Sequence, residues 1–282
     1  MPKILIFGAG YVGQLFADRL PDAVLTNVDI ADEEAVREVL ETYQPENVLN
    51  CAGKTGKPNV DWCESNKLPT FRSNTIGALI LAHACAERNI HLTHLGSGCI
   101  FYGPSPDPAG WRESDFGNPT AFYSRTKYAT DLVLSELPNV AVARLRMPID
   151  SVPGPRNLIT KLASYSKIID VENSVSVIDD LIHAVHQLME KRAQGIFHVV
   201  NEGTMKHRDL MALYHELVDP QHTNEWIEND ELVKQGLAVK GRSNCILQST
   251  RLRELGIEMR PISVALRDCM EKYAQAIKHI QP

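Results

Sequence analysis

The sequence predicts an α/β protein in which a doubly wound parallel sheet is followed by a smaller C-terminal domain. Short apolar runs alternate with amphipathic helical patterns along the first half of the chain, which is typical of a parallel sheet covered by helices on both faces. A glycine-rich turn follows the first apolar run, and a segment rich in proline and glycine at 147–156 interrupts the alternation. These three observations carry the prediction.

Five strands are expected where short apolar runs end at small or polar residues. They lie at 3–7, 23–28, 47–53, 90–95 and 140–145. Helices are expected between them, where apolar residues recur at three- and four-residue spacing. They run from the glycine turn to Leu20 and over 32–43, 68–88 and 120–137.

The proline- and glycine-rich segment predicts the domain boundary. Residues 1–147 form the expected first domain, and residues 148–282 form the second. A helix is expected at 157–166, a further helix at 178–192 and a strand at 196–200. Because the last two elements restore the helix–strand alternation, residues 171–200 are expected to return to the first domain.

Composition excludes several functional classes. The chain has 282 residues, of which 44% are hydrophobic and 23% charged, as in ordinary globular proteins. A net charge of −6 without a run of Lys or Arg argues against nucleic acid and anionic membranes as partners. No stretch approaches the roughly 18 apolar residues that cross a bilayer. The six cysteines lack metal-site spacing, so we expect reduced thiols, no metal and a cytoplasmic protein.

The glycine turn predicts a dinucleotide site. Gly8, Gly10 and Gly13 follow the pattern G-x-G-x-x-G, with Tyr11 and Val12 inside it. Glycines at this spacing let the backbone approach a pyrophosphate at the positive end of a helix. A tight turn alone would explain the pattern, but its place between a strand and a helix favours the cofactor site.

The region after the second expected strand bears on the choice of cofactor. Thr26 and Asn27 stand where an acidic ribose ligand is expected, and Asp29 comes slightly late. Without a carboxylate there to repel a 2′-phosphate, NADP(H) is favoured over NAD(H).

Two further positions predict an active site. Tyr123 and Lys127 are four residues apart and share a helix face, so the ammonium is expected to lower the pKa of the phenol. Ser97 directly follows the fourth expected strand and is placed to donate a hydrogen bond to a substrate carbonyl. Taken singly, a solvated helix pair and a serine in a glycine-rich turn remain alternatives.

With these residues in one consistent order, the chain resembles the extended short-chain dehydrogenase/reductase family, whose active site is a Ser-Tyr-Lys set. The resemblance runs nearly end to end. It implies a Rossmann-like domain, a smaller substrate-binding domain that closes over a nucleotide sugar, and NAD(P) as cofactor. It also implies that residues 50–53 line the cofactor and that Asn74 supports the active-site helix. The turn departs from the family's usual G-x-x-G-x-x-G.

A finer resemblance is carried by the stretch 50–65, which reads NCAGKTGKPNVDWCES, and by GCIF at 98–101, RMPI at 146–149, PRNLITK at 155–161 and RSN at 242–244. These are similar to the UDP-4-keto-6-deoxyglucose 3,5-epimerase/4-reductases that form UDP-rhamnose. The related dTDP-4-dehydrorhamnose reductases usually carry aspartate two residues after the serine. This chain carries Cys99, a residue that GDP-fucose synthase also places there for epimerisation.

The chemistry of epimerisation explains why a cysteine at position 99 would be useful. A C4 ketone acidifies the hydrogens at C3 and C5, and inverting each carbon needs a base on one face and an acid on the other. Cys99 is placed to serve one face, and Lys161 matches the lysine that the similar enzymes use on the other. By residue type alone, a small buried residue and a solvated helix charge are the simpler interpretations.

The resemblance completes the candidate site and leaves alternatives open. Arg242 is expected near the diphosphate of the sugar nucleotide. The predicted cofactor contacts are Gly8, Gly10, Tyr11, Val12, Gly13, Asp29, Ile30, Cys51, Ala52, Gly53, Tyr123 and Lys127, and the predicted substrate contacts are Lys54, Thr55, Asn157 and Arg242. A reductase without epimerase activity and a non-catalytic NADP-binding regulatory subunit are the competing functions. The nucleotide (UDP or dTDP) and a homodimer are left open.

Overall fold

The computed structural model describes residues 3–57 and 59–280, so Pro58, within the stretch that carries the finer resemblance, lies outside the described residues. Six strands form the main sheet: β1 (Ile4–Phe7), β2 (Ala23–Thr26), β3 (Asn47–Asn50), β4 (His91–Ser97), β5 (Val140–Leu145) and β10 (Gly195–Val199). Their order is β10-β5-β4-β3-β1-β2, and every neighbouring pair is parallel. The α/β, Rossmann-like fold prediction is confirmed.

The chain winds from β1 to β2 on one side and then to β3 on the other. The direction of winding therefore reverses between β1 and β3. In doubly wound sheets ligands bind beyond the carboxyl ends of the strands at this reversal. The helices on the two faces are α1 (Tyr11–Arg19), α2 (Glu33–Tyr43), α3 (Trp62–Ser65), α4 (Lys67–Phe71), the π-helical η1 (Arg72–Ile76), α5 (Gly77–Ala86), α6 (Phe122–Leu134) and α8 (Ile178–Glu190).

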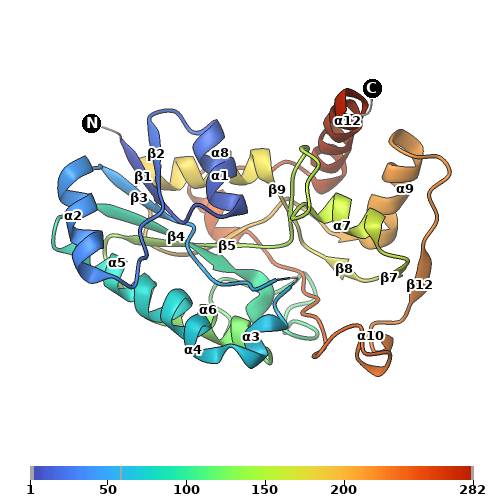
Figure 1. Ribbon diagram of the computed structural model, residues 1–282, viewed down its shortest axis with the longest axis horizontal. Helices are drawn as coiled ribbons and strands as arrows, with labels where there is room; N and C mark the ends of the chain where they lie inside the picture. The colour runs from blue at the N-terminus through green and yellow to red at the C-terminus, as the bar shows by residue number, and fades with distance from the viewer. Residues whose placement is uncertain (1–2, 58, 281–282) are drawn as a thin grey trace.

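Alternation along the strands produces two apolar layers. Ile6 of β1 belongs to a buried cluster with α1 and α8, whereas Leu5 belongs to a second cluster with α2 and α5. Successive side chains of a strand point to opposite faces, so one strand supplies both layers. Figure 1 shows α1 and α8 on one side of the sheet and α2, α5 and α6 on the other.

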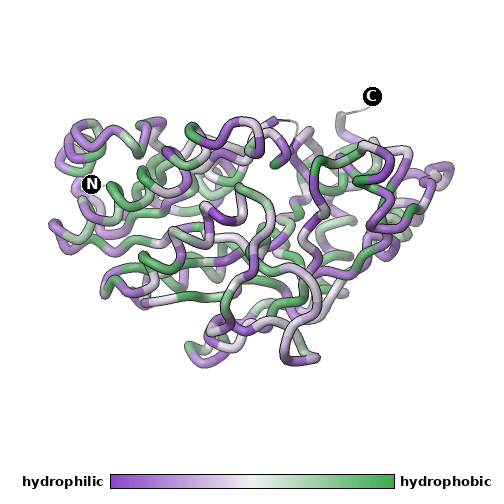
Figure 2. The backbone as a smooth tube through the Cα atoms, turned by 90° about the horizontal axis from the view of Figure 1, so that it is seen from below, coloured by the Kyte–Doolittle hydropathy of each residue, from purple (hydrophilic) through white to green (hydrophobic). Residues whose placement is uncertain are grey.

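The second part of the chain forms a smaller body beside the sheet, on the right in Figure 1. It contains β6 (Pro148–Ile149), α7 (Leu158–Ser164), β7 (Lys167–Ile169), β8 (Glu172–Asn173), β9 (Ser176–Val177), β11 (Met205–Lys206), α9 (His207–Leu217), β12 (Glu225–Ile227), α10 (Glu231–Lys234) and α12 (Ile262–Ile280). Helix α11 (Thr250–Glu254) packs instead on the main sheet, where Leu252 joins the cluster that contains Phe197 of β10. A separate buried cluster joins Ile159 of α7, Leu210 of α9 and Met270 of α12. Figure 2 shows apolar segments running through the interior and hydrophilic ones along the outer edges.

Two predicted elements differ from the structure. The third strand ends at Asn50 rather than at 53, because the Asn50 side chain accepts a hydrogen bond from the Ala52 amide at 3.0 Å and turns the chain. The helix expected over 68–88 is divided by the π-helical turn η1, which holds Asn74. A π-helical turn adds one residue to a helix and often marks a functional site.

The glycine turn yields a first prediction, for Gly13→Ala. A Cβ at Gly13 would lie 2.0 Å from the Gly8 carbonyl oxygen, so we expect the variant to lose about 1–3 kcal/mol of unfolding free energy. Gly10→Ala is the matched control, because nothing lies within 4 Å of a Cβ there. Thermal unfolding of both variants tests this, and equal melting temperatures would contradict it.

Candidate active site

The glycine turn leaves β1 exactly where the winding reverses. Gly8 has φ +101, a conformation that L side chains rarely adopt, and a Cβ there would lie 2.4 Å from the Ala52 nitrogen. Gly10 is the N-cap of α1, whose first turn has no side-chain cap and no acidic residue. The open space at Gly10 and the uncapped helix end together fit a pyrophosphate.

The segment after β3 forms the facing wall of this turn. A Cβ at Gly13 would lie 3.3 Å from Cys51, and the Ala52 amide is held by Asn50. Cys51 and Ala52 are half-buried and Gly53 is exposed. The structure thus brings Cys51 and Ala52 against the turn.

The region after β2 contains Asp29, which is exposed and lies 3.8 Å from the Arg72 guanidinium. Arg72 also donates to the Ala31 carbonyl at 3.2 Å. Ile30 is buried under α5, where a Cβ at Gly77 would lie 2.6 Å from it. The Asp29 carboxylate is therefore accompanied by a cation, so this pair does not present a net negative charge to a bound ligand.

Tyr123 lies in the first turn of α6 and is half-buried beside Ser97 and Cys99. Burial and the neighbouring Cys99 raise the pKa of the Tyr123 phenol, and the Ser97 hydroxyl opposes this. The phenol therefore keeps its proton at neutral pH and is able to donate it. Ser97 ends β4, is 6% exposed and accepts a hydrogen bond from the Cys99 amide at 3.2 Å.

Lys127 behaves differently from the prediction. Its Nζ donates to the Leu95 carbonyl at 2.6 Å and lies 2.9 Å from His94 Nε2. Burial lowers the pKa of Lys127 to about 8, while Asp131 and Cys51 oppose the shift. The expectation that Lys127 lowers the pKa of Tyr123 is wrong in this structure, because burial dominates at the phenol and the ammonium is directed to His94.

His94 is a site residue that the sequence analysis did not identify. Asn50 Oδ1 accepts from the Ala52 amide, so its Nδ2 donates to His94 Nδ1 at 3.0 Å. Burial and the nearby Lys127 hold the pKa of His94 well below its usual range. Asn50, His94 and Lys127 therefore connect the wall after β3 to the active-site helix.

Two side chains from distant segments hold α6 in place. Asn74 Nδ2 donates to Thr126 Oγ1 at 3.1 Å, which confirms the expected support of the active-site helix. Asn74 Oδ1 also accepts from the Lys54 amide at 2.6 Å. Glu64 Oε1 accepts from the Phe122 amide at 2.7 Å and so caps the first turn of α6, which Ala121 cannot do.

Cys99 and Lys161, which are predicted to exchange protons with the sugar carbons, lie on different bodies of the fold. Cys99 is in η2 (Gly98–Ile100), directly after β4, and is half-buried. Its Sγ accepts a hydrogen bond from Arg146 Nη1 at 2.8 Å. Lys161 lies in α7 and is half-buried, and burial with the nearby Arg156 lowers its pKa. Arg156 in turn donates to the Gly56 carbonyl at 3.3 Å, which brings this helix to the loop that follows β3.

The predicted substrate contacts differ in their exposure and in their hydrogen-bond partners. Lys54 is exposed and Thr55 is half-buried on the loop after β3. Arg242 forms a two-pronged ion pair with Asp61, at 2.8 and 2.9 Å, so its guanidinium faces the stretch that carries the finer resemblance. Asn157 gains no support as a ligand. It is fully buried, donates to the carbonyls of Asp150 and Val152, and caps α7.

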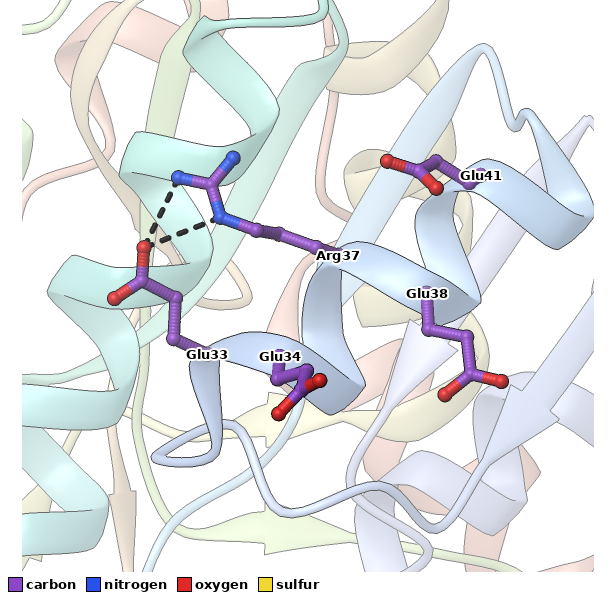
Figure 3. A pocket seen from close by; sticks show the side chains of 5 residues that line it. All are labelled: Glu33, Glu34, Arg37, Glu38 and Glu41. Carbon is purple, nitrogen blue, oxygen red and sulfur yellow. Dashed lines mark hydrogen bonds and ion pairs between the residues drawn. The ribbon is translucent and has the colours of Figure 1, made fainter.

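Other features of the described chain do not enlarge the site. Within residues 3–57 and 59–280, no cluster of His, Cys, Asp and Glu is suited to hold a metal ion. No helix in that part of the chain has the length and apolar character to cross a membrane. A hollow on α2 is lined only by Arg37 and four glutamates, Glu33, Glu34, Glu38 and Glu41, and by no predicted site residue (Figure 3).

The chain is similar to known proteins along nearly its whole length. The family model described as the RmlD substrate binding domain matches residues 2–275. A bifunctional dTDP-4-dehydrorhamnose 3,5-epimerase/dTDP-4-dehydrorhamnose reductase of Arabidopsis thaliana is 35% identical over 275 residues, covering 94% of this chain and 91% of that protein. A trifunctional UDP-glucose 4,6-dehydratase/UDP-4-keto-6-deoxy-D-glucose 3,5-epimerase/UDP-4-keto-L-rhamnose-reductase of the same plant is 33% identical, and this chain spans 41% of its length.

Solved structures show the same fold. The L780 UDP-rhamnose synthase from Acanthamoeba polyphaga mimivirus superposes with a TM-score of 0.89 at 31% identity, covering 95% of this chain and 98% of that one. A dTDP-4-dehydrorhamnose reductase from Bacillus anthracis, solved with NADP, superposes with a TM-score of 0.83 at 21% identity, covering 97% of this chain and 99% of that one.

Proposed function

The chain belongs to the RmlD substrate binding domain family, and on that premise we propose that it is a bifunctional 3,5-epimerase/4-reductase. Its substrate is a nucleotide-linked 4-keto-6-deoxyglucose, with UDP as the favoured nucleotide, and its product is the nucleotide-L-rhamnose. The observation that carries this proposal is the grouping of Ser97, Cys99 and Tyr123 at the carboxyl end of β4. The relatives at 33–35% identity that are named for both activities support it.

The residues of this chain have separate roles in hydrogen bonding and proton transfer. Ser97 and Tyr123 donate hydrogen bonds to the C4 oxygen, where negative charge develops both in the enolate and during reduction. Cys99 and Lys161 exchange protons with C3 and C5 from opposite faces of the sugar. Tyr123 then gives its proton to the C4 oxygen as the ketone becomes an alcohol. One pocket serves both reactions because both place charge on the same oxygen.

The cofactor in this proposal is NADPH, which supplies the hydride when bound. Gly8, Gly10 and Gly13 receive its pyrophosphate at the start of α1, and Lys127 holds the nicotinamide ribose. The balanced Asp29–Arg72 pair supports the preference for a 2′-phosphate. The relative from Bacillus anthracis that was solved with NADP is consistent with this choice.

We also retain the division into domains as a proposal, with residues 1–147 and 171–200 in the cofactor domain and the rest of 148–282 in the substrate domain. The packing of Leu181 of α8 and Phe197 of β10 in the sheet layer supports the return of this segment from α8 onward, whereas Val175 and Val177 pack in the cluster of the smaller body. Homodimer formation is supported by exposed apolar side chains on α4, η1 and α6, namely Leu68, Phe71, Ile76, Leu132 and Val133. A cytoplasmic location remains a prediction.

Deuterium exchange tests the epimerase activity. In D₂O with UDP-4-keto-6-deoxyglucose, the wild-type protein is expected to place deuterium at C3 and C5 of the sugar, measured by mass spectrometry. Cys99→Ala is expected to slow exchange by about 10²-fold or more, because one of the two proton-exchanging groups is gone. The same assay with the dTDP sugar, and with NADPH against NADH, decides the nucleotide and the cofactor.

Cys85→Ala is the matched control, because Cys85 is a free thiol in α5 that has no part in the proposed site. It is expected to exchange at the wild-type rate. No deuterium incorporation, with wild type and Cys99→Ala alike, would exclude the epimerase and leave a 4-keto reductase that receives an epimerised substrate.

A further inference from the structure

Arg146, which directly follows β5, carries a buried charge that the function proposed so far does not use. The residue is 4% exposed, and within the described residues it takes part in no ion pair with a carboxylate. Its Nη2 donates to Asn173 Oδ1 at 2.6 Å and to the Ser243 carbonyl, and its Nη1 donates to Cys99 Sγ. Its Nε is buried without a hydrogen-bond partner.

The neighbouring arginine shows that this arrangement is unusual. Arg144 lies two residues earlier, is 1% exposed and pairs with Asp131 at 2.8 Å. A buried guanidinium without a counter-ion costs several kcal/mol relative to a paired one. Neutral amide and carbonyl oxygens orient the Arg146 guanidinium but leave its net charge uncompensated, so an anion is expected to complete the site.

The titratable groups that face Arg146 identify that anion. They are the thiols of Cys99 and Cys245, the Tyr102 phenol and the His207 imidazole. Burial raises the pKa of Cys245, and its Sγ donates to the Gly98 carbonyl at 3.3 Å, so it is a thiol. Cys99 Sγ accepts a hydrogen bond from Arg146 Nη1 at 2.8 Å, so this sulfur lies directly against the guanidinium. Cys99 is the half-exposed member of the two.

We propose that Arg146 is a positioning residue that holds Cys99 as a thiolate and aims it at the substrate. This inference rests on the proposed role of Cys99 in epimerisation. The thiolate forms an S–H bond as a C–H bond beside C4 breaks, and the C–H electron pair passes into the enolate, with its charge on the C4 oxygen. A proton delivered from the opposite face then re-forms the C–H bond, and the thiol returns its proton to solvent.

Alkylation of Cys99 tests the proposal without any sugar. The thiolate is the form that reacts with iodoacetamide, so the rate between pH 6 and 9 reports the thiolate fraction. Digestion with trypsin leaves Cys99 as the one cysteine of peptide 89–112, and mass spectrometry follows its modification. We expect Arg146→Gln to reduce the rate at pH 7 about tenfold, shifting the profile by about one pH unit, and Arg146→Lys to retain most of the wild-type rate.

A second variant leaves the arginine in place. Asn173→Asp puts a carboxylate on the atom that Arg146 Nη2 already contacts, giving the guanidinium a competing counter-ion. It is expected to lower the Cys99 alkylation rate several-fold. Cys63, which is fully buried and alone in peptide 55–67, reports unfolding through its own alkylation. If Arg146→Gln exposes Cys63, Asn173→Asp and Arg146→Lys decide the question.

Identical alkylation profiles in the wild type and in the folded variants would overturn the proposal. The result is separate from the test of the epimerase, because alkylation needs neither sugar nor cofactor. An Arg146-dependent thiolate without deuterium exchange at C3 and C5 would uphold this inference and reject the epimerase. Deuterium exchange, together with a Cys99 alkylation rate that does not depend on Arg146, would uphold the epimerase and reject this inference.

Discussion

Tyr123→Phe is expected to lower the rate of 4-keto reduction by about 10²–10⁴-fold, the usual contribution of a positioned proton donor. The phenol lies beside Ser97 and Cys99, and burial raises its pKa, so it holds the transferable proton at neutral pH. Phenylalanine keeps the ring and removes only the hydroxyl group. NADPH oxidation in the presence of the keto sugar measures the loss, and NADPH binding by fluorescence is expected to stay near wild type.

Tyr128→Phe is the control for this variant. Tyr128 is a half-buried tyrosine on the same helix, and its ring packs near Gly117 rather than at Ser97. It is expected to leave the rate unchanged. If Tyr123→Phe retained full activity on every substrate while still binding NADPH, the chain would be a cofactor-binding regulatory subunit and not a reductase.

The fold could be predicted from the sequence because its main signals are local. The apolar run before Gly8, the pattern of α2 with Val36 and Leu40, and the turn at Gly13 each depend on a few neighbouring residues. The short strands of the second body could not be predicted in this way. Strand β8 and strand β11 have two residues each, and they exist because they pair with each other across more than thirty positions.

The candidate site, like the fold, could be predicted only in part from the sequence. Ser97, Tyr123 and Lys127 sit at recognisable places, but the partners that tune them come from remote strands. His94 has no sequence signal for its contact with Lys127, since the two meet only when β4 packs against α6. The spacing of Tyr123 and Lys127 suggested direct electrostatic coupling, and burial of both side chains outweighed it.

The stretch 50–65 shows how a resemblance can hide several structural roles. The stretch as a whole is similar to the UDP-rhamnose-forming enzymes, yet its residues have separate structural roles. Asp61 pairs with Arg242, which joins the substrate body to the loop after β3. Glu64 caps α6 and lies 3.3 Å from Lys240. Both carboxylates therefore link the two bodies, and no local pattern indicated their partners.

Asp131→Asn is expected to cost about 3–5 kcal/mol of unfolding free energy, because it leaves Arg144 as a buried charge without a counter-ion. Asp131 is fully buried and Arg144 is 1% exposed. His198 cannot replace the carboxylate, because an imidazole is neutral or cationic and cannot act as a counter-anion; burial and the nearby Arg144 lower its pKa to about 3 and keep it neutral. Urea denaturation followed by circular dichroism measures the loss.

Two comparisons separate the buried charge from the loss of a side chain. Glu33→Gln breaks the exposed pair with Arg37 on α2 (Figure 3), and solvent screening is expected to leave its stability unchanged. Replacing both buried partners, as Asp131→Leu with Arg144→Met, is expected to recover most of the stability, because no charge is then left unpaired. If the double variant were as unstable as Asp131→Asn, packing around β5 rather than the isolated guanidinium would explain the cost. If the double variant recovers its stability, the two buried arginines differ in what accompanies their charge. Arg144 is neutralised by the Asp131 carboxylate, whereas Arg146, two residues away, donates to Cys99 Sγ.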